Sequence, residues 1–211
     1  MKLGKLSLVL LLSFTLFSCL IYKQEINIFS DGSASLNISY SIDKKTLKSL
    51  EDFNKVAKNA STKETIQYFD ELAIESYLDS FKEIKSHSVR VYADKTRVYT
   101  EIKADISNLR TALNAGLIPY AHLSKNEGNW LFSYSTPYDF KTIKDKKALE
   151  RLSQVEIDFT INTPSKIITS SNKNFTDKKV RWKFSPKSPQ QAHSIPQSFF
   201  VEFSGDKISF D

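Results

Sequence analysis

The stretch Gln24-Glu25-Ile26-Asn27-Ile28-Phe29-Ser30-Asp31-Gly32-Ser33-Ala34-Ser35-Leu36-Asn37-Ile38-Ser39-Tyr40 decides the fold, because it reads as a complete β-hairpin. Apolar residues recur at every second position on both sides of Asp31-Gly32. This alternation is typical of strands with one buried face. The Asp-Gly pair predicts a type I′ turn, whose two central residues both take positive φ. The folded body therefore begins with an antiparallel hairpin.

Beyond this hairpin the apolar spacing changes from two to three and four, which predicts two amphipathic helices. Asp43 can cap the first helix, and its apolar stripe runs from Leu47 to Ala57. Asn59-Ala60-Ser61 breaks the pattern. Thr62 can cap the second helix, whose stripe ends at Phe81.

The remainder of the chain returns mainly to a period of two. A second hairpin with its turn at Asp94-Lys95 is expected, then a short helix capped by Asp105 or Ser107 and ended by Gly116. Further strands are predicted around residues 130–134, 155–161, 180–184 and 199–203, with an ambiguous helix at 140–152 and an extended loop at 185–198. No linker divides these elements, so residues 24–211 are expected to form one α+β domain, an antiparallel sheet packed against the two helices.

The N-terminal 18 residues have the layout of a secretory signal. Lys2 and Lys5 precede a twelve-residue, mainly apolar run from Leu6 to Phe17. This run is too short to span a bilayer, which needs roughly 20 apolar residues. We therefore expect a signal peptide at 1–18 and a short tether at 19–23.

Cys19 is the only cysteine of the chain. Leu16-Phe17-Ser18-Cys19 resembles the lipobox of bacterial lipoproteins, in which the cysteine becomes the N-terminus and carries lipid chains. A lone thiol in an oxidising compartment has no intrachain partner, and lipid attachment would account for it. The expected location is the bacterial cell envelope, on an inner or an outer membrane. The alternative is a plain secreted protein with a free thiol.

The net charge of +6 comes from 30 Lys and Arg against 24 Asp and Glu, and it is not concentrated in one long tract. The densest segments, Lys141–Lys147 and Asp177–Arg181, are each interrupted by an acidic or apolar residue. A nucleic-acid groove needs clustered cations interleaved with stacking aromatics, so no nucleic acid is expected as a partner. These lysines are interpreted as a solvated surface, with anionic lipid headgroups as the alternative contact.

Catalytic motifs are absent from the sequence. His87, His122 and His193 have no metal-ligand spacing, and no Gly-x-Ser-x-Gly elbow occurs. With only five glycines, a glycine-rich phosphate loop is not available. The chain is therefore predicted not to be an enzyme and to need no cofactor or metal.

Aromatic residues give the clearest hint of a contact site. Trp130, Phe132 and Tyr134 crowd one strand, and Phe200 follows Phe199 on another, so the two phenylalanines must face opposite sides. Core packing explains most of these residues. The competing hypothesis is that Trp130, Phe132, Tyr134 and Phe200 contact an apolar ligand or a partner.

The order of elements resembles the LppM-type lipoprotein domain. The residues that carry this resemblance are Asp31-Gly32-Ser33-Ala34-Ser35-Leu36, Phe159-Thr160-Ile161-Asn162-Thr163-Pro164, Ser171-Asn172 and Lys179-Val180-Arg181-Trp182. Ser165 follows the proline where the family typically has glycine. The resemblance implies an α/β domain similar to lipid-binding folds, with an envelope lipid or glycolipid as ligand and no catalytic residues.

These observations predict a membrane-anchored envelope lipoprotein that binds a lipid, a glycolipid or another apolar ligand. The ligand is expected between the sheet and the helices of residues 43–81. The alternative is a surface-exposed lipoprotein that binds a host or envelope protein. An enclosed apolar cavity of several hundred Å³, roughly the scale of a small-molecule site, would favour the first hypothesis.

Overall fold

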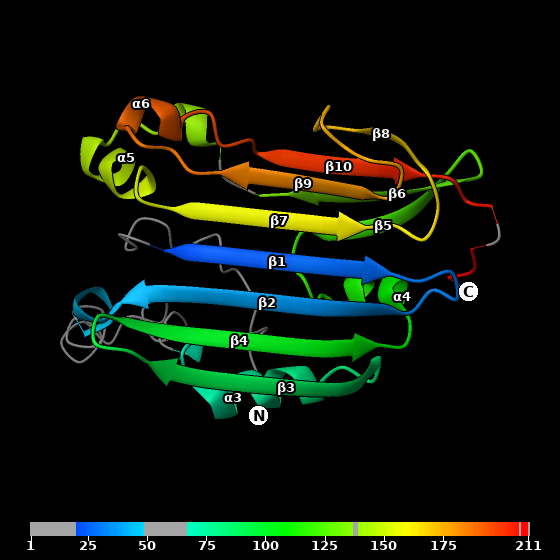
Figure 1. The fold of residues 1–211 in the computed structure, drawn as a ribbon, viewed down its shortest axis with the longest axis horizontal. Helices are drawn as coiled ribbons and strands as arrows, with labels where there is room; N and C mark the ends of the chain where they lie inside the picture. The colour runs from blue at the N-terminus through cyan, green and yellow to red at the C-terminus, as the bar shows by residue number, and fades with distance from the viewer. Residues whose placement is uncertain (1–19, 49–66, 137–138, 207, 211) are drawn as a thin grey trace.

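The computed structural model describes residues 20–48, 67–136, 139–206 and 208–210, in which ten strands form two sheets (Figure 1). The six-stranded sheet has the order β3 (Ile84–Ala93), β4 (Arg97–Ile106), β2 (Ala34–Asp43), β1 (Ile21–Ile28), β7 (Glu156–Asn162), β9 (Lys179–Phe184). The four-stranded sheet has the order β5 (Ala121–Asn126), β6 (Asn129–Ser135), β10 (Ser198–Phe203), β8 (Ile167–Ser170). The helices are α3 (Glu71–Asp79), α4 (Leu109–Asn114), the 3₁₀ turn η1 (Phe140–Thr142), α5 (Lys146–Leu152) and α6 (Pro189–Ala192). The predicted α+β class is confirmed.

The opening hairpin is confirmed, with Ile26 opposite Leu36 in the antiparallel pair of β1 and β2. Its turn differs from the type I′ prediction. Among the turn residues only Gly32 has positive φ, at 81°, and its N–H donates to the Phe29 carbonyl at 3.2 Å. Asp31 instead accepts from the Ser33 N–H at 3.0 Å. A longer loop with one left-handed glycine therefore closes the hairpin.

β1 lies inside the six-stranded sheet, paired antiparallel with β2 and parallel with β7. The tether expected at residues 19–23 is therefore largely strand. Ile21 already pairs with Ser41 and Glu156, and Leu20 is only 2% exposed. Cys19 and the expected signal peptide lie outside the described residues. The sheet thus begins almost directly after Cys19.

The core lies on the inner face of the six-stranded sheet, which is turned away from the viewer in Figure 1. The four-stranded sheet covers the β7 and β9 side, where the rings of Phe132 and Phe159 are 6.1 Å apart across the two sheets. Helix α3 packs against β3. The Tyr77 hydroxyl of α3 donates to the Gly116 carbonyl at 3.0 Å, which links α3 to the end of α4. Both layers therefore share one apolar core.

The helices predicted at 43–81 differ in part from the structure. Residues 44–48 are helical, and the rest of the first predicted helix, together with the break after it, lies outside the described residues. The start predicted at Thr62 also lies outside the described residues. Gln67 is helical, and after a turn the helix α3 begins at Glu71, where the Asp70 carboxylate caps it by accepting from the Ala73 N–H at 3.2 Å. Tyr68 forms a turn whose carbonyl accepts from the Tyr40 and Thr100 hydroxyls. These side-chain contacts outweigh the apolar periodicity.

Smaller corrections have similar local causes. Asn108, not Asp105 or Ser107, caps α4, because Asp105 still pairs within β4. The end of that helix near Gly116 is confirmed.

The segment 140–152 divides into η1 and α5, since Asp145 caps α5 by accepting from the Lys147 N–H at 2.8 Å. The loop predicted at 185–198 contains α6, capped by Ser188. Strand β5 was not predicted, because it buries only Ala121 and Leu123.

Candidate functional site

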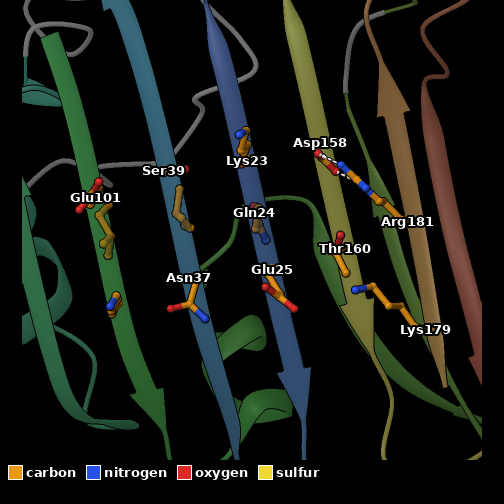
Figure 2. Close-up of a pocket in the computed structure, with 13 residues that line it drawn as sticks. Lys23, Gln24, Glu25, Asn37, Ser39, Glu101, Asp158, Thr160, Lys179 and Arg181 are labelled. Carbon is orange, nitrogen blue, oxygen red and sulfur yellow. Dashed lines mark hydrogen bonds and ion pairs between the residues drawn. The ribbon is translucent and has the colours of Figure 1, made fainter.

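The outer face of the six-stranded sheet is polar, and no helix or strand of the described residues covers it (Figure 1). A shallow groove of about 610 Å³ crosses this face over β4, β2, β1, β7 and β9 (Figure 2). This volume lies within the range of small-molecule sites, roughly 300–1,000 Å³. We call it the outer groove.

Strand register arranges the side chains of the outer groove in rows across the sheet. Residues directly opposite one another on neighbouring strands bring their side chains close together. One row is Lys103, Asn37, Glu25, Thr160 and Arg181; the next is Glu101, Ser39, Lys23 and Asp158. Cations and carboxylates alternate along both rows, so the groove offers mixed charge.

Asp158 and Arg181 form an ion pair in the outer groove. The guanidinium Nε donates to Asp158 Oδ1 at 2.7 Å, and a second nitrogen donates to Oδ2, which makes the pair bidentate (Figure 2). The hydrogen bonds from Arg181 hold the pKa of Asp158 below its usual value. This carboxylate is therefore ionised throughout the physiological pH range. Lys23 lies directly opposite it on the neighbouring strand β1.

Other groups of the outer groove have no side-chain partner among the described residues. Asn37 and Ser39 on β2 make no side-chain hydrogen bond there, and Lys23, Lys103 and Lys179 form no ion pair. Amides and hydroxyls both donate and accept, whereas ammonium groups only donate and carboxylates only accept. A ligand with many hydroxyl groups could use all of these groups at once.

A second concavity, the inter-sheet cleft, is apolar and lies between the two sheets. Tyr22, Phe140, Ile157 and Phe199 are among its lining residues, and its volume is about 30 Å³. One molecule in liquid water occupies about the same volume. The inter-sheet cleft is therefore far smaller than the apolar cavity that would favour an enclosed lipid.

Gln24, like Thr136, is a buried polar residue in the lining of the inter-sheet cleft. It is 5% exposed, and its side-chain oxygen accepts from the Tyr22 hydroxyl. Burial raises the pKa of Tyr22 well above its ordinary value, so this hydroxyl stays a donor. The Gln24 Nε2 has no partner among the described residues. An unpaired buried donor of this kind costs about 1–3 kcal/mol.

The structure places the aromatic residues singled out from the sequence in two environments. Trp130, Phe132 and Tyr134 lie on β6 and are 3%, 0% and 8% exposed. Tyr134 stacks on Phe199 at 4.9 Å and lines the inter-sheet cleft. These three residues are part of the core.

Phe200, by contrast, is 38% exposed on the outer side of the four-stranded sheet. Phe199 is 8% exposed, which confirms that the two neighbours face opposite sides of β10. The structure thus does not bring Phe200 together with the other three aromatics.

Sequence reasoning missed the outer groove, although it recognised the polar faces of the strands. Each lining residue occupies an ordinary outward position, such as Asn37 or Thr160. Only the order of the strands brings them together, because β7 and β9 come more than a hundred residues after β1. No local pattern could reveal this arrangement.

In the described ranges, no group of three or more His, Cys, Asp or Glu could hold a metal ion. None of the helices that the structure describes is long and apolar enough to cross a membrane.

Comparisons with known proteins support the fold. No family model matches the sequence, and no curated protein matches it. Among solved structures, the fold is similar to the NMR structure of the folded domain of LppM from Mycobacterium tuberculosis. The TM-score is 0.50 at 12% sequence identity, and the match covers 89% of this chain and 91% of that one. The LppM-like architecture expected from the sequence is therefore present.

Proposed function

We propose that this protein is a non-catalytic binding protein of the bacterial cell envelope, which holds the headgroup of a glycolipid in the outer groove. One observation carries the proposal: a groove of about 610 Å³ lined by donors and acceptors from five strands. Sugar hydroxyls both donate and accept hydrogen bonds, so they match a surface where Asn37 and Ser39 lie between charged groups.

The small volume of the inter-sheet cleft, the apolar concavity found between the sheets in the described residues, is the reason for proposing the headgroup, and not the acyl chains, as the contact. The inter-sheet cleft of about 30 Å³ cannot enclose a lipid chain without movement of the sheets. A protein that is itself anchored to a membrane does not need to extract the lipid. The acyl chains remain in the bilayer while the headgroup reaches the sheet.

Native mass spectrometry of protein extracted from its own membranes tests this proposal. Wild type is expected to carry a bound lipid, and the N37A/S39A variant is expected to lose it. Neither side chain has a hydrogen-bond partner among the described residues, so folding should be little affected. The control is S88A/K183A, which removes two exposed side chains of the same sheet outside the groove. A wild type without lipid, or a groove variant that keeps it, contradicts the proposal.

Membrane attachment through Cys19 is the second part of the proposal. Its support is the lipobox-like sequence before Cys19 and the short distance to β1, which begins at Ile21. Two or more acyl chains hold a protein firmly at a membrane. Cys19→Ala is expected to abolish lipid labelling and to shift the protein from the membrane fraction to the soluble fraction. Sedimentation of the variant with membranes at the wild-type level would contradict anchoring.

A second candidate function, binding of a host or envelope protein, rests on the exposed apolar residues of the four-stranded sheet. Phe200 is 38% exposed and Ile168 on the adjacent β8 is 49% exposed. A photo-cross-linking residue at position 200 should then trap one defined protein in whole cells. The control position is Leu72 on α3, which is 76% exposed. Equal products from both positions would rule out a specific partner at Phe200.

A further inference from the structure

Helices α5 and α6 lie together at one end of the molecule (Figure 1). We call this end, with the adjoining η1, the basic end, because exposed lysines are frequent in these segments. Its exposed lysines are Lys141, Lys144, Lys146, Lys147 and Lys187. None of them forms an ion pair with a carboxylate among the described residues. Their side chains are therefore available to an external partner.

The chain enters the fold at this same end. The Leu20 carbonyl accepts from the Glu156 N–H at 2.8 Å, and Glu156 follows α5 by only a few residues. Figure 1 shows the start of β1 on the same side of the molecule as α5 and α6. The sequence before Leu20 contains the apolar run Leu6–Phe17 and the proposed anchor Cys19. Whatever holds the N-terminus at a membrane therefore holds the basic end near it.

Folding does not account for these lysines. Lys146 and Lys147 occupy the first turn of α5, where the helix dipole disfavours cations. The nearby carboxylates of Asp139 and Asp145 cap η1 and α5 by accepting backbone N–H groups, and they do not pair with the ammonium groups. Cations that the local fold does not need point to a role outside the fold.

We propose that the basic end is a membrane-facing surface that contacts anionic lipid headgroups. An anionic bilayer attracts each nearby lysine by about 1 kcal/mol, which corresponds to about fivefold in binding. Several such contacts would orient the domain so that the basic end and the start of β1 both face the membrane. This inference depends on the membrane location in the proposed function but not on the outer groove.

Vesicle flotation with the full-length chain tests the inference. Detergent-purified protein is diluted into vesicles of phosphatidylcholine alone or with about one third phosphatidylglycerol. The apolar N-terminus contributes to binding in both cases, so the measured quantity is the ratio between the two. Wild type is expected to bind the anionic vesicles at least about tenfold better, and about 0.5 M salt should remove the difference.

Matched variants make the result specific. K141Q/K144Q/K147Q is expected to lose most of the preference for anionic vesicles. K85Q/K166Q/K173Q removes the same charge from exposed lysines outside the basic end and should keep it. The groove variant N37A/S39A should keep it as well, which separates this inference from glycolipid binding. Equal binding of wild type to both vesicles, or equal loss in the K85Q/K166Q/K173Q variant, would overturn the inference.

Discussion

At the scale of single residues, Gln24 is a polar side chain at a buried position of β1. Its neighbours Tyr22 and Ile26 point to the same face of β1 and are buried, so the strand pattern favours an apolar side chain. A glutamine there has one bonded oxygen and one unpaired amide nitrogen. The sequence shows the alternation but not the lack of a partner, because that depends on the residues packed opposite.

Replacing both members of this pair should stabilise the protein. In Y22F/Q24L the unpaired donor disappears and no hydroxyl is left without an acceptor, so the free energy of unfolding should rise by about 1–2 kcal/mol. The matched control is Tyr40→Phe, whose hydroxyl donates to the Tyr68 carbonyl and should cost about 1 kcal/mol. Urea denaturation measures both. A double variant less stable than wild type would mean that the Gln24 amide is satisfied in solution by water or a ligand.

Aspartates with a lowered pKa, Asp94 and Asp158 among them, make the stability of the fold depend on pH in the acidic range. Arg181 lowers the pKa of Asp158, and the Tyr99 hydroxyl with nearby backbone N–H groups lowers the pKa of Asp94. A lowered folded-state pKa adds stability above the unfolded value of about 3.9, and this stability is lost as pH falls through the folded pKa.

The urea midpoint should therefore stay nearly constant from about pH 7 to 5 and fall below about pH 4. Asp158→Asn should lower the midpoint at neutral pH and flatten the acid decline. Lys103→Gln removes an exposed cation of the same sheet face that does not contribute to the lowered pKa of Asp158 or Asp94, so it should leave the pH profile unchanged. A D158N profile parallel to wild type would show that the ion pair contributes nothing.

At the scale of elements, the sequence predicts strands better than helices. The opening hairpin and β7 have clean alternation, because each has one face buried against the shared core. The start of α3 could not be found from periodicity, since contacts from Tyr40 and Thr100, distant in sequence, hold Tyr68 in a turn. The edge strand β5 also has no clear sequence pattern. Its last three residues are all exposed, so the alternation of apolar and polar positions stops after Leu123.

Two glycines with positive φ should respond differently to alanine. Gly116 has φ of 93°, and a Cβ added there would meet no atom within 4 Å, so Gly116→Ala should cost only the left-handed backbone penalty of about 1–2 kcal/mol. Gly32 has φ of 81°, and a Cβ there would lie 2.4 Å from the Ser209 carbonyl oxygen. Gly32→Ala should therefore cost at least about twice as much, since backbone must move. Equal midpoints for both variants in urea would show that the C-terminal segment does not pack on this turn.

At the scale of the whole molecule, the outer groove and the core are opposite faces of one sheet. Tyr22 and Gln24 face the inter-sheet cleft, while Lys23 and Glu25 face the outer groove. The sequence predicts this alternation within each strand. It does not predict that β1 pairs with β7, and that pairing is what places Asp158 and Thr160 beside the residues of the opening hairpin.

The two sheets should unfold as one unit, because aromatic side chains join them. Phe199 of the four-stranded sheet lies 5.0 Å from Trp182 and 4.9 Å from Phe159 of the six-stranded sheet. The only two tryptophans report on different sheets: Trp130 on β6 and Trp182 on β9. W130F therefore leaves a fluorescence probe in the six-stranded sheet, and W182F leaves one in the four-stranded sheet.

In each single-tryptophan variant, the urea transition seen by fluorescence should coincide with the transition seen by far-ultraviolet circular dichroism. Both variants lose some packing, so the comparison is made between probes within one variant and not between variants. A fluorescence midpoint that precedes the dichroism midpoint in either variant would mean that one sheet opens first. The inter-sheet cleft would then be a hinge at which acyl chains could enter, and enclosure of the lipid would become the better account of binding.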